Sequence, residues 1–238
     1  MKDITTYTTD FELITPWDFS TVWAIDAGLN NGYPYLRQVI TETVEVEVEV
    51  DDSDGVSKAV EAAAPNSGDA NNDGIQDSEQ PTVTSTLSPV SGKYVVLEVG
   101  GVCASNDSVL LEQETKVTTK DDDGFDYPAG LLDFSLTGCG VGGTETITQY
   151  YYGEYDLSNV VLRKYDKAND TYTTISDALL SIVTIGGQQA VKAVYTVTDG
   201  GFLDADGIAN GTIVDPVGLG TEVETLADTG SETFLLPI

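Results

Sequence analysis

The sequence contains no histidine, and its 10 lysine and arginine residues face 40 aspartate and glutamate residues, which gives a formal net charge of −30 at pH 7. Without histidine the chain cannot form a Ser-His-Asp or Cys-His catalytic site, an HExxH zinc site or a histidine proton relay. The negative charge repels nucleic-acid phosphates and anionic lipid headgroups. We therefore exclude nucleic acid as a partner and expect the surface to attract cations, above all Ca²⁺, which prefers carboxylate and carbonyl oxygens.

Cysteine is also scarce, with only Cys103 and Cys139 present. Two cysteines are too few for a disulfide scaffold or a Cys₄ zinc site, but they suffice for one bridge in an oxidising compartment. Each lies in a glycine-rich turn region at the end of a presumptive strand. We predict a disulfide between them, whose closed loop would stabilise the fold by about 3–4 kcal/mol in the chain-entropy model. Two unpaired turn cysteines are the alternative.

Long apolar runs are missing too. No stretch reaches the ~20 apolar residues of a membrane span, and the first residues lack the apolar segment of a signal peptide. The acidic, threonine-rich and histidine-free composition is nevertheless typical of extracellular proteins. We expect a piece of a longer secreted protein, with no direct membrane span in this fragment.

What the chain has in quantity is material for strands and turns, because 40% of it is hydrophobic and it contains 12 tyrosines and 24 glycines. From residue 81 to residue 220, strand-like runs alternate with Gly-Gly, Asn-Asp and Asp-Gly turn signals. The pattern predicts an all-β fold, an antiparallel β-sandwich, over 81–220. The runs are Lys93–Val99, Leu131–Leu136, Thr144–Tyr152, Val160–Tyr165, Ala178–Ile185 and Ala190–Val197.

The first 38 residues place aromatic side chains around an Asn-Gly turn, as a small β segment would. The order Phe-Ser-Thr-Val-Trp-Ala-Ile, then Asn-Asn-Gly-Tyr-Pro-Tyr-Leu, resembles the closing segment of bacterial adhesins built from GLUG-type β-helix repeats. The resemblance implies that 1–38 is the terminal segment of an upstream repeat region in the same polypeptide. A short hairpin with its own minor core is the alternative.

Residues 39–80 form an acidic spacer. Valine and glutamate alternate strictly from Thr43 to Val50, which is the period of an edge strand or an extended spacer. Val56–Ala64 could form a short helix that ends at Pro65.

Two acidic glycine loops in this spacer have the spacing of calcium loops. The second loop matches more positions, with side-chain oxygens at 1, 3, 5 and 9, a backbone carbonyl at 7, and Gln80 instead of glutamate at 12. The first loop has Val50 at position 1 but glutamate at 12. The pair resembles thrombospondin type 3 repeats, which implies a calcium-stiffened linker; a flexible acidic linker is the alternative. The expected ligands are Asp52, Asp54 and Glu61 in the first loop, and Asp69, Asn71, Asp73, Ile75 (through its carbonyl) and Asp77 in the second.

The most distinctive stretch is Thr198–Pro216, TDGGFLDADGIANGTIVDP. It resembles the C-terminal signature of the bacterial choice-of-anchor U domain, and the resemblance extends back through Tyr127–Phe134 and Tyr94–Glu98. It implies a non-enzymatic, β-rich extracellular domain placed before a surface-anchoring signal. Five oxygen donors among the glycines could bind Ca²⁺, or could instead cap turns as Asx side chains do. They are Asp199, Asp204, Asp206, Asn210 and Asp215.

The tail, 221–238, is expected to be flexible and contains a sorting-like motif, Leu226, Ala227, Asp228, Thr229 and Gly230. It resembles the LPxTG signal of sortase substrates, with alanine in place of proline. The resemblance implies a sortase-like transpeptidase as partner, which would cleave between Thr229 and Gly230 and join the chain to the cell wall. A disordered acidic tail with a chance match is the alternative.

Three functions follow. The first is a non-catalytic, calcium-stiffened stalk and anchoring module on the bacterial cell surface. The second is a secreted carbohydrate- or ligand-binding sandwich, for which Tyr150–Tyr152 and Tyr155 could form an aromatic platform. The third is a carboxylate enzyme such as a glycosidase, which requires a cleft with one carboxyl of raised pKa. We expect the first and do not expect an enzyme.

Overall fold

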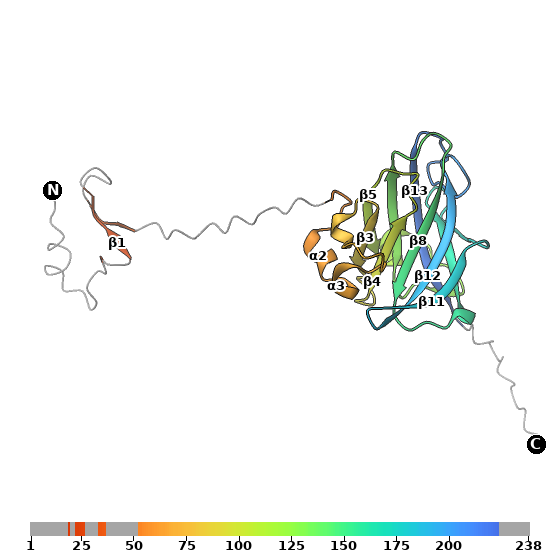
Figure 1. Ribbon diagram of the computed structural model, residues 1–238, viewed down its shortest axis with the longest axis horizontal. Coiled ribbons are helices and arrows are strands. Elements are labelled where there is room, and N and C mark those ends of the chain that lie inside the picture. Colours follow the sequence, from red (N-terminus) through yellow and green to blue (C-terminus); the bar gives the residue numbers. More distant parts are fainter. Residues whose placement is uncertain (1–18, 20–21, 27–32, 37–51, 224–238) are drawn as a thin grey trace, which may run out of the picture. The chain divides into compact units, whose positions relative to one another are not determined.

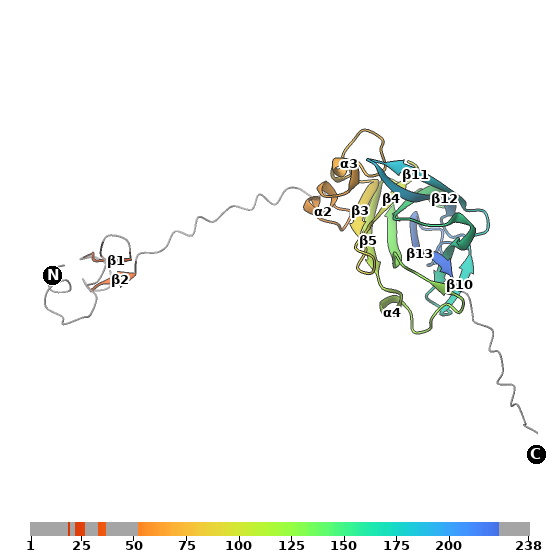
Figure 2. The ribbon, with the colours of Figure 1, turned by 90° about the horizontal axis from the view of Figure 1, so that it is seen from below.

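The computed structural model describes residues 19, 22–26, 33–36 and 52–223, and the chain divides into two compact units between Val48 and Glu49. In the first unit, β1 (Trp23–Ala24) pairs antiparallel with β2 (Tyr35–Leu36), as expected for a small N-terminal β segment (Figure 2). The Val-Glu alternation at 43–50 and the sorting-like motif lie outside the described residues.

The second unit is a β-sandwich of two antiparallel sheets, which confirms the predicted fold class (Figure 1). The six-stranded sheet has the order β10 (Thr171–Thr174), β9 (Val160–Asp166), β13 (Thr212–Glu222), β7 (Leu131–Thr137) and β5 (Ser105–Glu112), with β6 (Phe125–Asp126) paired to β13. The five-stranded sheet has the order β11 (Leu179–Ile185), β12 (Gln188–Thr198), β8 (Thr144–Tyr152), β4 (Tyr94–Val99) and β3 (Val83–Leu87).

The main core fills the space between the two sheets. Along β8, Ile147 and Tyr151 point into it, and along β7 Leu132, Phe134 and Leu136 do the same at a period of two. Each of these side chains is at most 1% exposed. The alternation that predicted the strands therefore also selects the residues that form the core.

A second hydrophobic cluster covers the other face of the five-stranded sheet. Val96, Tyr150 and Tyr152 project to this face, where Ala64 and Ala70 of the segment 52–80 pack against them. That segment contains α2 (Lys58–Ala62), α3 (Pro65–Gly68) and the 3₁₀ turn η2 (Asp77–Glu79). In Figure 2, α2 and α3 lie beside β3. The described part of the acidic spacer, with its predicted short helix, is therefore a third layer on the sandwich.

The last strand, β13, was not foreseen, because its sequence contains the turn-forming residues Pro216, Gly218 and Gly220. Glycine at 218 has a packing reason: a Cβ there would lie 2.6 Å from a side-chain methyl of Leu131 and 2.7 Å from the ring of Tyr127. β13 continues to Glu222, two residues past the expected end of the sandwich at 220.

The predicted disulfide between Cys103 and Cys139 is present and closes a sequence separation of 36 residues. The short elements α4 (Glu114–Val117) and η3 (Leu157–Asn159) connect strands. Among the described residues, no helix has the length and apolar character needed to cross a membrane.

Candidate metal centre

The first acidic loop makes a tight turn just before α2. Ser53 and Gly55 have φ angles of 73° and 98°, in the left-handed region that favours glycine. Asp54 Oδ1 accepts a hydrogen bond of 2.8 Å from the backbone N–H of Val56, which fixes the turn. The turn brings Asp52 and Asp54 toward the side of α2 that bears Glu61.

The three acidic side chains of this loop converge. One carboxylate oxygen from each of Asp52, Asp54 and Glu61 lies within 4.8 Å of the other two. Two oxygens bound to one Ca²⁺ at about 2.3–2.6 Å can be no more than roughly 4.6–5.2 Å apart. The spacing therefore fits a shared ion. In the described ranges of the chain, this is the only set of three carboxylates that lie so close.

Glu61 places a carboxyl group where water does not reach it. Its side chain is fully buried, and its Oε1 accepts a hydrogen bond of 3.1 Å from the backbone N–H of Ser85 on β3. No donor among the described residues reaches its Oε2. Burial, followed by the nearby Asp54 carboxylate, raises the pKa of Glu61 from 4.5 to about 9. An ion bound here would supply both the missing partner and the opposite charge.

The second loop uses its oxygens differently. Asp69 accepts hydrogen bonds from the backbone N–H groups of Asp73 and Gly74, and Asn71 Oδ1 accepts one from Asp73. Asp77 is fully buried, and it accepts from the Ala70 N–H and the Ser85 hydroxyl. Burial raises its pKa to about 6.

The residues at positions 5 and 7 of this loop, Asp73 and Ile75, both contact the residue at position 12, Gln80. The Gln80 side-chain amide donates to Asp73 Oδ1 at 3.3 Å and to the Ile75 carbonyl at 3.5 Å. The three carboxylates of the loop nevertheless do not approach one another as those of the first loop do. Calcium in the second loop stays a prediction.

The oxygen donors between 199 and 215 organise turns. Asp199 accepts from the N–H groups of Gly142, Asn210 and Gly211, and Asp204 accepts from two further backbone N–H groups. Asp206 and Asn210 cap the turn between them. This is the Asx-turn arrangement. Asp215 does not join them, because its side chain lies in the core.

The largely buried cluster around Asp215 was missed by sequence reasoning. Asp215 contacts Lys164 of β9 and Tyr195 of β12. A signal was present, since Lys164 shares the strand period with Val160 and Leu162 and so falls on the buried face.

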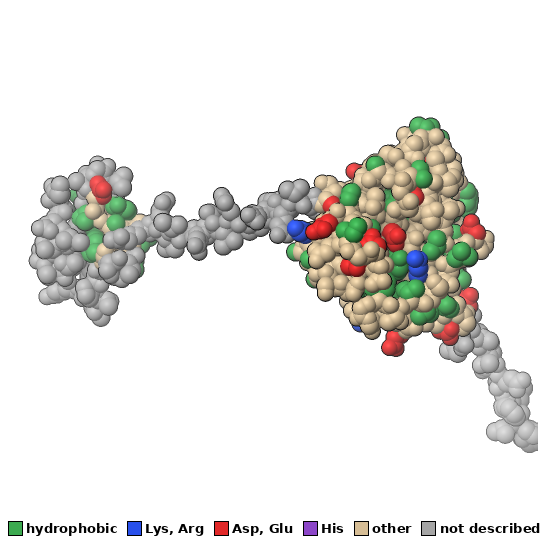
Figure 3. Space-filling model, viewed as in Figure 1, with side chains coloured by type: hydrophobic (Ala, Val, Ile, Leu, Met, Phe, Trp, Pro, Cys, Tyr) green, Lys and Arg blue, Asp and Glu red, His purple; other side chains and the backbone are tan. Residues whose placement is uncertain are grey.

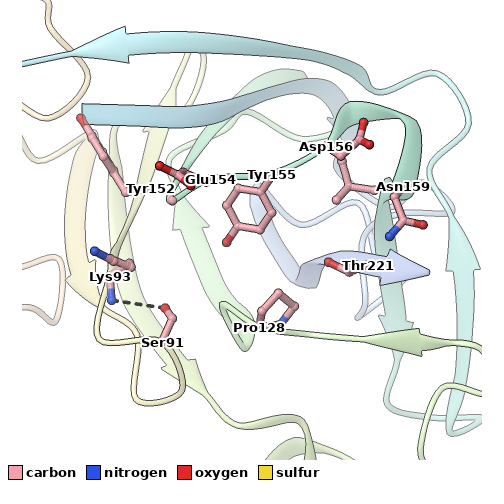
Figure 4. A pocket seen from close by; sticks show the side chains of 11 residues that line it. Ser91, Lys93, Pro128, Tyr152, Glu154, Tyr155, Asp156, Asn159 and Thr221 are labelled. Atoms are coloured by element: carbon pink, nitrogen blue, oxygen red, sulfur yellow. Dashed lines mark hydrogen bonds between the residues drawn. The ribbon is translucent and has the colours of Figure 1, made fainter. Parts of the chain in front are cut away.

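The second unit also has a cavity of about 390 Å³ near the end of β8 (Figure 4). Tyr155 points into its middle, with Lys93 and Glu154 on one side and Asn159 on the other. The other tyrosines of the expected aromatic platform, 150 to 152, are buried and at most 4% exposed. Of the described carboxyl groups, Glu61, Asp77 and Asp215 have a raised pKa, and none of these three lines the cavity.

Comparisons with protein-family models, with curated proteins and with solved structures find no match to this chain. The resemblances to a choice-of-anchor domain, to thrombospondin type 3 repeats, to a β-helix repeat and to a sortase signal therefore stay predictions.

Proposed function

We propose that this chain is a non-catalytic stalk and anchoring module of a bacterial, adhesin-like cell-surface protein, in which Ca²⁺ fastens the acidic segment to the β-sandwich. The observation that supports it most is the convergence of Asp52, Asp54 and Glu61 at the first described turn of that segment. A cation at this point would tie the turn, α2 and, through the Ser85 N–H, β3 into one rigid junction.

The donor set favours Ca²⁺ over other metals. All three side chains offer oxygen, which suits a hard cation, whereas Zn²⁺ and Cu²⁺ prefer nitrogen or sulfur ligands. The sequence spacing matches a calcium loop at positions 3, 5, 6 and 12, namely Asp52, Asp54, Gly55 and Glu61. A dissociation constant of about 10⁻⁴–10⁻³ M would suffice for an extracellular module. Figure 3 shows acidic side chains over the visible face of this unit with few basic ones between them, a surface that attracts cations.

The anchoring role is proposed from the sequence that follows β13. β13 ends at Glu222, and the sorting-like motif begins at Leu226, among residues outside the described ranges. A transpeptidase would take Leu226–Gly230 in extended form, break the Thr229–Gly230 bond and transfer the Thr229 carbonyl to a cell-wall amine.

Hydrogen exchange tests the calcium junction. Exchange in 52–80 should slow when about 10 mM Ca²⁺ replaces EDTA. Asp54→Asn should abolish the slowing, whereas Asp123→Asn, which removes an exposed carboxylate elsewhere, should preserve it. Exchange that is the same with and without Ca²⁺ in the wild-type protein would contradict the proposal.

Transpeptidation tests the anchoring role separately. A sortase incubated with the chain and a glycine-based amine should yield a product joined at Thr229. The variant Leu226→Ala should not react. Cleavage elsewhere, or none, would remove the anchoring part of the proposal and leave the calcium junction standing.

The cavity beside Tyr155 supports a second candidate, a secreted carbohydrate- or ligand-binding module. An aromatic ring surrounded by Lys93, Glu154 and Asn159 is a combination that can stack on a sugar and bond to its hydroxyls. A glycan array should then show binding that Asn159→Ala weakens. An array without a single specific glycan would eliminate this candidate.

A further inference from the structure

A lysine and an aspartate meet inside the core of the sandwich. Lys164 Nζ lies 2.6 Å from Asp215 Oδ1, and the two side chains are 4% and 0% exposed. β9 and β13 are antiparallel neighbours, and Asp215 lies two residues before Val217, the cross-strand partner of Lys164. The two side chains are therefore diagonal neighbours on the same face of the sheet.

That face packs against the other sheet. Leu162 and Val217, which share the face with the pair, belong to the main core, as does Phe134, the cross-strand partner of Asp215 on β7. Tyr195, on β12 of the opposite sheet, donates its hydroxyl to Asp215 Oδ2 at 2.6 Å. Both oxygens of the carboxyl group are therefore held in place, and the site is closed to bulk water by apolar side chains.

The charged form of this pair is poorly satisfied. An ammonium has three N–H donors, and within the described chain Lys164 finds one acceptor, Asp215 Oδ1. Burial raises the pKa of Asp215, although Lys164 and Tyr195 act in the opposite direction. A proton shared over 2.6 Å can therefore pass from nitrogen to oxygen, which leaves a neutral amine beside a neutral carboxylic acid, the form that an apolar environment favours.

We propose that Lys164 and Asp215 condense to an intramolecular isopeptide bond that joins β9 covalently to β13. The inference is independent of calcium and of anchoring. It assigns a self-modification site to a pair that would otherwise be only a buried ion pair.

The step balances without a cofactor. After the first proton transfer, the Nζ lone pair attacks Asp215 Cγ, and the Tyr195 hydroxyl stabilises the negative charge that develops on Oδ2. A second proton passes from Nζ to Oδ1, the Cγ–Oδ1 bond breaks, and Oδ1 leaves as water. Nζ keeps one hydrogen in the resulting amide. Neither an oxidant nor a reductant is required.

The packing supplies what the reaction needs. Holding the amine against the carboxyl group replaces a bimolecular encounter with a unimolecular step, which can contribute roughly 7–11 kcal/mol to lowering the barrier. Lys167, the residue that follows β9, provides a contrast within the chain because it pairs with Asp133. Those side chains are 46% and 25% exposed, so water reaches both groups and we expect no condensation there.

Mass spectrometry of the whole chain tests the proposal directly. The denatured and reduced protein should weigh less than its sequence by the mass of one water molecule. Trypsin should not cleave after Lys164, because its ε-amine is acylated. The peptide 164–167 should appear joined to the peptide 193–238, which follows the last basic residue, Lys192, and contains Asp215.

Variants define the atoms involved. Lys164→Arg keeps the positive charge but has no comparable nucleophile, and it should restore the full mass and the linear peptide 193–238. Lys167→Arg, the matched control, should keep both the mass deficit and the branched peptide. Tyr195→Phe, which retains the ring, should leave a larger share of chains linear; an unchanged share would remove Tyr195 from the mechanism.

Two results would overturn the proposal in wild-type protein shown to be folded by circular dichroism. One is the full sequence mass, with the peptide 193–238 recovered unbranched. The other is a water loss mapped to an Asp-Gly bond, as succinimide formation gives, without the branched peptide. Because the decisive measurement uses the unmutated chain, a variant that fails to fold does not affect it.

Discussion

Glu61→Gln should change stability in opposite directions with and without calcium. In the metal-free protein, burial and the Asp54 carboxylate raise the pKa of Glu61 from 4.5 to about 9. At pH 7 the unfolded chain has therefore lost this proton, while the folded chain retains it. The interval from 4.5 to 7, at about 1.4 kcal/mol per pH unit, costs the folded state about 3 kcal/mol. Glutamine has no proton to take up, and its amide can donate to the neighbouring carboxylates.

The variant should thus be more stable than wild type in EDTA by up to about 3 kcal/mol, or about 6–12 °C in Tm for a unit of this size. In Ca²⁺ at about 100 times the dissociation constant, wild type should gain about 2.7 kcal/mol, and the variant should gain far less because a carboxylate ligand is missing. Glu79→Gln makes the same charge change at an exposed site in η2 and should stay within about 0.5 kcal/mol of wild type in both buffers.

The pH dependence has a definite sign. A carboxyl group whose pKa is higher in the folded state stabilises that state most at low pH, so metal-free wild type should lose stability as pH rises from 4.5 toward about 9. The variant should lack this component. Urea unfolding at several pH values measures it. A variant that is less stable than wild type in EDTA, or that gains as much from Ca²⁺, would refute the reasoning.

Three further changes test the sandwich. Replacing Cys103 and Cys139 with alanine removes a constraint over 36 residues and should lower the free energy of unfolding by about 4 kcal/mol; equal urea midpoints would contradict this. Arg163→Lys keeps the charge but loses the bidentate hydrogen bonds to Asp122, which are 2.7 and 2.6 Å long. It should lower the free energy of unfolding by about 1–3 kcal/mol in the same assay, and an unchanged free energy would show that charge alone matters. Gly218→Ala puts a Cβ 2.6 Å from a leucine methyl and should cost about 1–3 kcal/mol in thermal unfolding, a prediction that an unchanged Tm would exclude.

Much of the fold was predictable because strand periodicity is local. The six runs chosen from alternation and turn signals correspond to β4, β7, β8, β9, β11 and β12, with ends that agree within two residues. The strand β13 could not be predicted in this way, because Pro216, Gly218 and Gly220 locally favour turns. Its strand conformation depends on packing between β7 and β9, which no local pattern contains.

The residues of the candidate site were predictable from the sequence. Which of the two loops brings its carboxylates together was not. Calcium-loop spacing selected Asp52, Asp54 and Glu61, and the structure gathers them, whereas the second loop matches more positions and does not gather its carboxylates. The difference arises from tertiary structure. Ser85 on β3 donates its backbone N–H to Glu61 and its hydroxyl to Asp77. The position of this one strand therefore determines hydrogen bonds of an acidic side chain in each loop. Asp215, which spacing grouped with turn aspartates, likewise takes its role from Lys164 on another strand.

The order of strands in the six-stranded sheet affects how the protein is made. β13 lies between β9 and β7, yet in the sequence it follows every other described strand. While the chain is being synthesised, β7 and β9 are complete long before the strand that joins them. Until Thr212–Glu222 is made, each offers an unpaired edge that can add a strand from another molecule. A nascent chain cut short before this strand should therefore aggregate, and the sandwich can close only after Thr212–Glu222 has been synthesised.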